Sequence, residues 1–291
     1  MNILHRHSWG LQFETWLNSA GFKSKPLRLA RGDGLSELIA LGDISALDRP
    51  IVIFLHGLGN DALFPNLNLF RYLLETGYNV VTADIDGHGK NCTSKLSSST
   101  IRTLVEGVIE QLDQLTVGRP RIHLCGYSFG AVLMLDFAVH HPERVQSLSL
   151  IGMPLYLQSS FLIMTEILSP LSKSYLASLK DYGIIGIQPA IGPILRERYP
   201  VRLHEAEIGS YLHVGAKIIE QINPLSKLEL VTFPTLLING GLDFVANHAG
   251  TVEFLDSLEV QRFTLKGETH FTCMLSQKMA RRIEVLLRTS P

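Results

Sequence analysis

The sequence contains few cysteines, and their spacing suggests neither a metal site nor a disulfide. Cys92, Cys125 and Cys273 are the three cysteines in a chain of 291 residues. An odd number of widely separated cysteines is typical of a reducing compartment and argues against a disulfide framework. Each is expected to fill space, and Cys125 to be buried and unreactive. The sequence therefore implies no disulfide, no metal and no organic cofactor.

Blocks of charge of one sign are also missing. The chain has 26 basic and 27 acidic side chains, which give a formal net charge of −1, and no run of either sign occurs. Nucleic acids and anionic membrane surfaces attract proteins that concentrate positive charge. We therefore expect no nucleic-acid partner.

Long apolar runs are the third absence. No stretch of about 18 apolar residues is present, so the sequence predicts no membrane span. The first ten residues, MNILHRHSWG, lack the long apolar region of a secretory signal. Together with the cysteine usage, these features favour a soluble, cytoplasmic protein. The oligomeric state cannot be predicted from the sequence.

Apolar residues make up 46% of the chain, which is enough for one large domain. The runs Ile51–Leu55 and Tyr78–Ala83 are too uniformly apolar for a sheet that is wet on one face, which favours parallel strands buried on both sides. Further strands are predicted over Val145–Ile151 and Thr235–Asn239. Helical patterns alternate with them over Leu63–Leu74, with Gly77 as the expected C-cap, over Ile101–Leu115, where the spacing is clearest, and from about Val245, as in right-handed β-α-β crossovers. The sequence thus predicts an α/β fold with helices on both faces of a mostly parallel sheet.

The N-terminal part of the chain follows a different pattern. Residues 1–24 predict an extension with a short amphipathic helix that stops at Gly21. Packing over the edge of the core is favoured over a membrane-surface or partner-binding role, because the polar face of this helix is not basic. The runs Pro26–Arg31 and Leu35–Leu41 are separated by Gly32-Asp33-Gly34 and predict a hairpin, so the sheet should begin antiparallel.

The stretch Arg121–Ala131, RIHLCGYSFGA, sets a serine between a strand pattern and a helix pattern. The apolar strand breaks at Gly126, and an apolar helical pattern starts directly after Gly130. Glycines two residues before and two residues after Ser128 permit a sharp turn, from which the hydroxyl projects above the sheet beside the first amides of the helix. This pattern predicts a nucleophilic serine.

A serine nucleophile needs a general base, and the base needs an acid that orients it. Among 11 histidines, His270 is the one that follows the last predicted strand, and a strand-end loop there would put it on the same side of the sheet as Ser128. Asp243 follows another strand and is the predicted acid. Glu268 is the alternative, although it shares the loop of His270.

The alternation of strands and helices stops between Pro154 and about Leu230, where prolines favour short helices. We expect residues 154–230 to form a helical cap, inserted before the seventh strand of a core domain made of residues 25–153 and 231–291. Its many apolar side chains would either line a pocket above Ser128 or form the core of the cap itself, since the two are alike in composition.

Four motifs resemble the α/β-hydrolase superfamily, and most of all its capped esterase and lipase branch, which includes monoacylglycerol-lipase and S33 peptidase relatives. These motifs are His56-Gly57-Leu58-Gly59, Asp84–Gly89, Gly126–Gly130, and Asp243 with His270. The chain order of serine, acid and histidine is also that of this fold. The resemblance covers Ile51 to the last helix and implies the α/β-hydrolase fold, with eight strands in a mostly parallel sheet.

The resemblance also implies an oxyanion hole formed by the backbone N–H groups of Leu58 and Phe129. His56 and His88 would lie beside the site, where fixing a loop by hydrogen bonds is favoured over a direct part in catalysis.

Two positions depart from the family pattern. Relatives usually carry arginine where Asp86 stands and serine where Asn91 stands. Neither position belongs to the triad, so these departures bear on packing and not on chemistry.

These residues together predict a serine hydrolase that cleaves a small-molecule carboxylic ester with an apolar acyl or alcohol part, through an acyl-enzyme on Ser128. Cleavage of a thioester, an amide or a carbon–carbon bond stays open, as does acyl transfer to an alcohol, because the fold does not fix the function. A ligand-binding or scaffold homologue without turnover is the alternative outside enzymology.

Overall fold

The computed structural model describes residues 8–31, 34–44, 49–58, 60, 62–63, 66–85, 88, 121–156, 208–243, 245–246 and 251–290. Several predictions fall outside these residues. They concern Gly59, Asp86, Gly87, Gly89, Asn91, Cys92, the helix over 101–115 and positions 157–207 of the expected cap.

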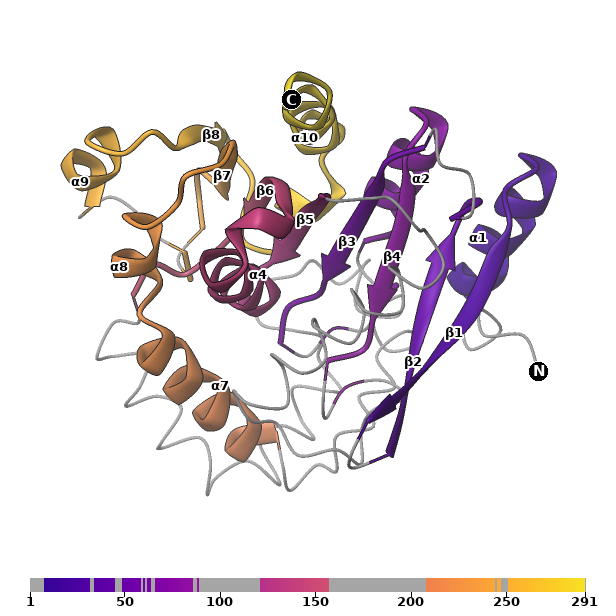
Figure 1. Cartoon of the computed structure of the whole chain (residues 1–291), viewed down its shortest axis with the longest axis horizontal. Coiled ribbons are helices and arrows are strands. Elements are labelled where there is room, and N and C mark those ends of the chain that lie inside the picture. Colours follow the sequence, from indigo (N-terminus) through magenta and orange to yellow (C-terminus); the bar gives the residue numbers. More distant parts are fainter. Residues whose placement is uncertain are drawn as a thin grey trace.

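The described part of the chain contains one sheet of eight strands in the order β1-β2-β4-β3-β5-β6-β7-β8 (Figure 1). The first two strands form an antiparallel hairpin, β2 pairs antiparallel with β4, and every other pairing is parallel. The prediction of a mostly parallel sheet with an antiparallel start is confirmed. The strands are β1 (Ser24–Arg31), β2 (Gly34–Leu41), β3 (Ile51–Leu55), β4 (Asn79–Ala83), β5 (Ile122–Tyr127), β6 (Val145–Ile151), β7 (Thr235–Gly240) and β8 (Gln261–Leu265).

Strand β5 lies near the middle of the sheet, between β3 and β6, and all six of its residues are buried. It continues through Gly126 and Tyr127, so it ends two residues later than the apolar pattern predicts. Because parallel strands carry their carboxyl ends at one edge of the sheet, the segments that follow β3, β5, β7 and β8 meet at that edge. The predicted site residues lie in these segments.

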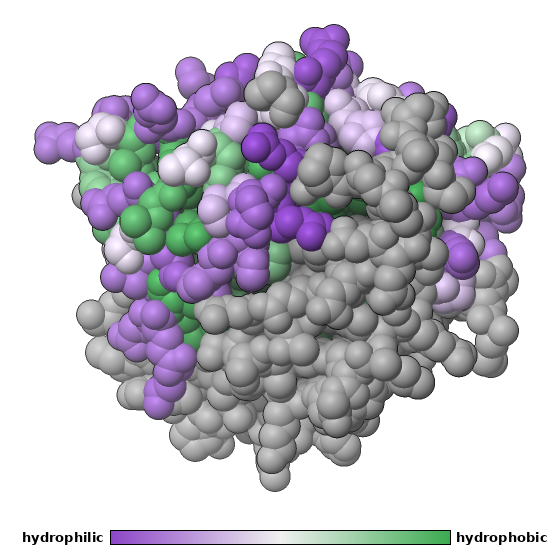
Figure 2. Space-filling view, in the orientation of Figure 1, coloured by the Kyte–Doolittle hydropathy of each residue, from purple (hydrophilic) through white to green (hydrophobic). Residues whose placement is uncertain are grey.

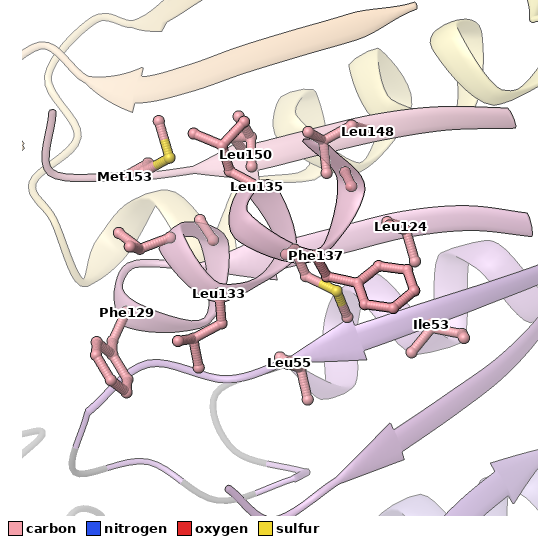
Figure 3. Close-up of a cluster of buried hydrophobic side chains, with 14 of the residues drawn as sticks. Ile53, Leu55, Leu124, Phe129, Leu133, Leu135, Phe137, Leu148, Leu150 and Met153 are labelled. Carbon is pink, nitrogen blue, oxygen red and sulfur yellow. The ribbon is translucent and has the colours of Figure 1, made fainter. Parts of the chain in front are cut away.

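Helices cover both faces of the sheet (Figure 1). One apolar layer joins the sheet to α4 (Phe129–His140), α7 (Ile208–Ile222), α8 (Pro224–Leu228) and α9 (Val252–Asp256), and the other joins it to α1 (Ser8–Ser19), α2 (Leu67–Glu75) and α10 (Gln277–Thr289). Short 3₁₀ helices η2 (Pro142–Arg144) and η4 (Thr272–Leu275) precede β6 and α10. Figure 3 shows α4 laying Leu133, Leu135 and Phe137 against the strands.

Helix α2 ends as its sequence predicts but begins later. Gly77 has a φ of +98°. The N–H of Gly77 donates to Leu74 and that of Tyr78 to Leu73, which together form a Schellman cap that glycine accommodates without strain. At the other end the predicted start, Leu63, precedes the helix, and its carbonyl accepts a hydrogen bond from Asn66 N–H.

Helix α1 packs on the edge of the core, as predicted. Its Phe13 and Leu17 are buried in the same cluster as α2, and the Arg71 guanidinium of α2 lies 5.0 Å from the Trp16 ring centroid. Within the described residues, no helix is both long and apolar enough to cross a bilayer.

Two predicted helix boundaries are wrong. A helix from about Val245 was expected, but Val245 and Ala246 are not helical, and α9 begins at Val252. The segment before β7 was expected to hold only short helices, yet α7 has 15 residues, because its apolar residues repeat at helical spacing and no proline interrupts it. It ends shortly before Pro224, where α8 begins.

Candidate active site

Ser128 sits on the turn between β5 and α4, in a backbone conformation that few residues adopt. Its φ and ψ are +52° and −116°, and it is one of two non-glycine residues with positive φ among the described residues. Its N–H donates to the Ile151 carbonyl of β6 at 2.7 Å, and its carbonyl accepts the N–H of Ala131 at 3.0 Å. The strand and the helix therefore hold this strained conformation from both sides.

The glycines on either side of the turn have no room for a side chain. A Cβ at Gly126 would lie 2.6 Å from the Cα and N of Ala131, and one at Gly130 would lie 2.6 Å from the carbonyl carbon of Leu55. Each clash would be with backbone, which cannot rotate away as a side chain does. The two glycines thus permit the sharp turn that the sequence pattern predicts at Ser128.

Ser128, His270 and Asp243 are joined by hydrogen bonds. His270 Nε2 lies 2.9 Å from Ser128 Oγ, and His270 Nδ1 lies 2.9 Å from Asp243 Oδ2. The histidine and aspartate are buried, whereas Ser128 is partly exposed. The three residues come from the segments after β5, β7 and β8, so parallel topology brings together side chains up to 142 positions apart.

The Asp243 carboxylate is held in place by its own loop. Its Oδ1 accepts the N–H groups of Val245 at 2.9 Å and Ala246 at 2.8 Å, which leaves Oδ2 for His270. Of the two acids considered, Asp243 is the one bonded to His270. Glu268 contributes its backbone carbonyl, which accepts the N–H of Leu242 and joins the two loops.

The backbone around Leu58 lies next to Ser128. A Cβ added to Gly57 would lie 3.0 Å from Ser128 Cβ, so the segment after β3 passes directly beside the turn. Phe129 is the first residue of α4, where N–H groups have no partner inside the helix. Within the described residues, no hydrogen-bond acceptor is found for the N–H of Leu58 or of Phe129.

Helix α7 approaches the same segment from the other side. A Cβ at Gly215 would lie 2.6 Å from Leu58 Cδ1, so the Leu58 side chain occupies the notch that this glycine leaves in the helix. The segment before β7 therefore contacts the loop beside Ser128.

His56 fixes a loop. The N–H of Ile85 donates to its Nε2 at 2.9 Å, so the proton is on Nδ1, which donates to the Gly57 carbonyl at 2.8 Å. Complete burial lowers the pKa of His56 to about 4, against a smaller opposing effect of its bond to Gly57. The His88 ring packs edge-on against it, with centroids 4.9 Å apart. Both histidines therefore support the loop after β3 and do not contact the Ser128 hydroxyl.

No metal site is evident in the described ranges, where no cluster of three or more His, Cys, Asp or Glu side chains is arranged to bind an ion. Cys125 is buried, and burial raises the pKa of its thiol, so it stays protonated and unreactive. Sequence reasoning missed Tyr127, whose hydroxyl donates to the His270 carbonyl at 3.0 Å. No sequence pattern could have indicated this contact, because it joins a side chain to distant backbone.

The chain is similar to several known hydrolases. The model of a family described as serine aminopeptidase, S33, matches residues 47–271. The putative carbamate hydrolase RutD of Variovorax paradoxus is 33% identical over 107 residues, 36% of this chain and 38% of that protein. A 2-hydroxy-6-oxononadienedioate/2-hydroxy-6-oxononatrienedioate hydrolase of Paraburkholderia phymatum is 32% identical over 129 residues, 41% of this chain and 42% of that protein. The chain thus spans about two fifths of the length of these relatives.

Solved structures are similar over a larger share of the chain. A putative lipase from Acinetobacter baumannii superposes with a TM-score of 0.68, covering 97% of this chain and 96% of that one at 19% sequence identity. At this level of identity the likeness establishes the shared fold.

Proposed function

The chain belongs to the S33 serine aminopeptidase family of α/β-hydrolases, and from this we propose that it is a serine hydrolase that cleaves a carboxylic ester with an apolar acyl or alcohol part. The observation that carries the proposal is the unbroken chain of hydrogen bonds, 2.9 Å each, from Ser128 through His270 to Asp243. A serine hydroxyl becomes a nucleophile when a base can take its proton, and the base works when an acid holds its tautomer.

In the proposed mechanism, Ser128 Oγ attacks the ester carbonyl carbon while its proton moves to His270 Nε2. Asp243 accepts the Nδ1 proton in a hydrogen bond and stabilises the imidazolium that forms. His270 then gives its new proton to the departing alcohol, which leaves the acyl group on Ser128. Water, activated by the same imidazole, releases the acid and restores the serine.

The negative charge that develops on the carbonyl oxygen needs donors fixed in advance. We assign this role to the N–H groups of Leu58 and Phe129, because both flank Ser128 and neither has an acceptor among the described residues. Loss of one such donor typically lowers turnover by about 10²–10³-fold.

Preference for an apolar substrate is supported by the surroundings of Leu58. Its apolar side chain fills the notch at Gly215 of α7, so an apolar contact between the two segments borders the proposed oxyanion donors. Residues 154–230, which include α7, are the part of the chain that we propose as the cap above the substrate.

A fluorophosphonate probe tests the nucleophile directly. We expect the folded protein to be labelled on Ser128, and Ser128→Ala to lose both the label and roughly 10⁴-fold or more of its esterase turnover. Ser226→Ala is the matched control, because among the described residues the hydroxyl of this exposed serine of α8 donates only to the Asn223 carbonyl. Absence of labelling in the wild type, or labelling that persists in Ser128→Ala, would show that the proposal is wrong.

A substrate panel tests the choice of bond. We expect p-nitrophenyl esters of increasing acyl length to be cleaved faster than acyl thioesters or anilides with the same acyl groups. Faster cleavage of thioesters would instead indicate a thioesterase. Tight binding without product release, unchanged in Ser128→Ala, would indicate a homologue without turnover.

A further inference from the structure

The backbone carbonyl of His270 accepts hydrogen bonds from two side chains. The Tyr127 hydroxyl donates to it at 3.0 Å, across 143 positions of sequence, and the Cys273 thiol donates to it at 2.9 Å from the next turn of chain. Neither side chain has a part in the proton transfers of the proposed mechanism. We refer to Tyr127 and Cys273 with this carbonyl as the carbonyl bridge.

All members of the carbonyl bridge are buried. Tyr127 is 1% exposed, Cys273 0% and His270 4%. A buried carbonyl without a hydrogen-bond donor is destabilised by its full desolvation penalty, so both donors stabilise the observed position of the backbone. Burial, reinforced by the nearby Asp243 and Glu268 carboxylates, raises the pKa of the Cys273 thiol, which therefore keeps its proton and can donate.

The carbonyl bridge connects the base directly to the strand that carries the nucleophile. Tyr127 is the last residue of β5 and immediately precedes Ser128. Its ring also packs beside the His270 imidazole, with centroids 5.3 Å apart and planes inclined by 33°. Any shift of the His270 backbone relative to Ser128 must therefore break or stretch the bond to Tyr127.

We propose that Tyr127 and Cys273 are positioning residues that fix the distance between the His270 imidazole and Ser128 by holding the His270 carbonyl. The inference depends on the proposed serine hydrolase function. Two donors to one acceptor give partial redundancy, because either can hold the carbonyl when the other is removed. The effect of removing both should exceed the product of the single effects.

Steady-state kinetics on three variants test this inference. We expect Tyr127→Phe and Cys273→Ala each to lower kcat by roughly threefold to tenfold, and the double variant to lower it by roughly 10²-fold or more, with KM within about twofold of the wild type. The rate of labelling by a fluorophosphonate should fall in parallel. A second double variant, Tyr127→Phe with Cys273→Ser, keeps an O–H donor at position 273. Its kcat should therefore recover most of what the double variant with Cys273→Ala loses.

Tyr78→Phe is the matched control. It deletes the hydroxyl of another buried tyrosine, which lies at the start of β4 and so at the other end of the sheet from Ser128. It should leave kcat unchanged even if the midpoint of thermal unfolding falls as it does for Tyr127→Phe.

The outcomes separate the two proposals. Wild-type protein that labels on Ser128, with a double variant that folds and keeps its kcat, overturns the positioning role alone. A change in KM without a change in kcat also overturns it. Wild-type protein that does not label overturns the serine hydrolase and the positioning role together. Because Tyr127→Phe adds no atoms, that single variant decides the question if the double variant does not fold.

Discussion

Ser128 keeps its positive φ because backbone packs tightly on both sides of its turn. Gly130→Ala would put a Cβ 2.6 Å from the Leu55 carbonyl carbon, and the helix and strand would have to separate to admit it. We expect a loss of about 3 kcal/mol in the free energy of unfolding, measured by urea denaturation, because overpacking against rigid backbone is costly. Fluorophosphonate labelling of Ser128 should fall as well.

Gly241→Ala is the control for this prediction. The nearest atoms to its added Cβ would be 3.4 Å away, which is ordinary van der Waals contact. A change of less than about 0.5 kcal/mol is expected. Equal stability of the two variants would contradict the steric account of the turn.

The same turn shows which site residues the sequence could predict. Ser128, Asp243 and His270 were predictable because each lies in a segment that follows a strand of a parallel sheet, where position along the chain determines the edge on which a residue lies. The bond between Tyr127 and the His270 carbonyl was not predictable, because any residue offers a carbonyl and only the final packing selects one. Likewise, the sequence does not reveal that the N–H groups of Val245 and Ala246 donate to the Asp243 carboxylate.

Among the secondary-structure elements, α4 and α8 are joined by an ion pair that is largely shielded from water. Lys227 Nζ lies 2.8 Å from Asp136 Oδ1, and the two side chains are 17% and 13% exposed. Lys227→Met would remove this cation from a poorly solvated carboxylate, which also lies 3.6 Å from His140 Nδ1. We expect it to reduce the free energy of unfolding by about 2 kcal/mol in urea denaturation.

A double-mutant cycle separates this pair from general packing. Adding Asp136→Asn to Lys227→Met should recover part of the lost free energy of unfolding, since the charge of the Asp136 carboxylate is then removed as well. The Arg288 to Glu284 pair, at 3.7 Å and with 69% of the Arg288 side chain exposed, offers a comparison: Arg288→Met should cost less than about 0.5 kcal/mol. If Lys227→Met costs no more than Arg288→Met, the pair does not stabilise the contact between α4 and α8.

Strands were easier to predict than helices in this chain, for a physical reason. The buried parallel strand β3 is uniformly apolar, and the predicted bounds of both β3 and β6 match the observed ones. Helix ends depend on caps and on competing hydrogen bonds, which explains why α2 starts four residues after the predicted Leu63. The prolines of the segment before β7 predict only short helices, but none of them lies within α7, which is therefore longer than predicted.

For the molecule as a whole, the sheet buries neutral histidines near both of its edges. His56 follows the carboxyl end of β3, whereas His123 lies near the start of β5, where its Nδ1 is 2.8 Å from Ser147 Oγ. Burial lowers the pKa of each to about 4, from an ordinary value of 6.5. The unfolded chain therefore binds protons at these positions at a higher pH than the folded protein does.

This difference makes stability depend on pH, with a definite sign. The contribution of the two neutral histidines to the free energy of unfolding has its full value above about pH 6.5. It declines as the pH falls toward about 4, because the unfolded chain then binds protons that the folded protein does not. As the pH falls from about 7 to about 5, each of the two histidines should lower the free energy of unfolding, measured by urea denaturation, by about 2 kcal/mol. His123→Gln removes one of these groups and should lose about 2 kcal/mol less over the same range. Identical pH dependence of His123→Gln and wild type would mean that His123 is not the neutral, buried group described here.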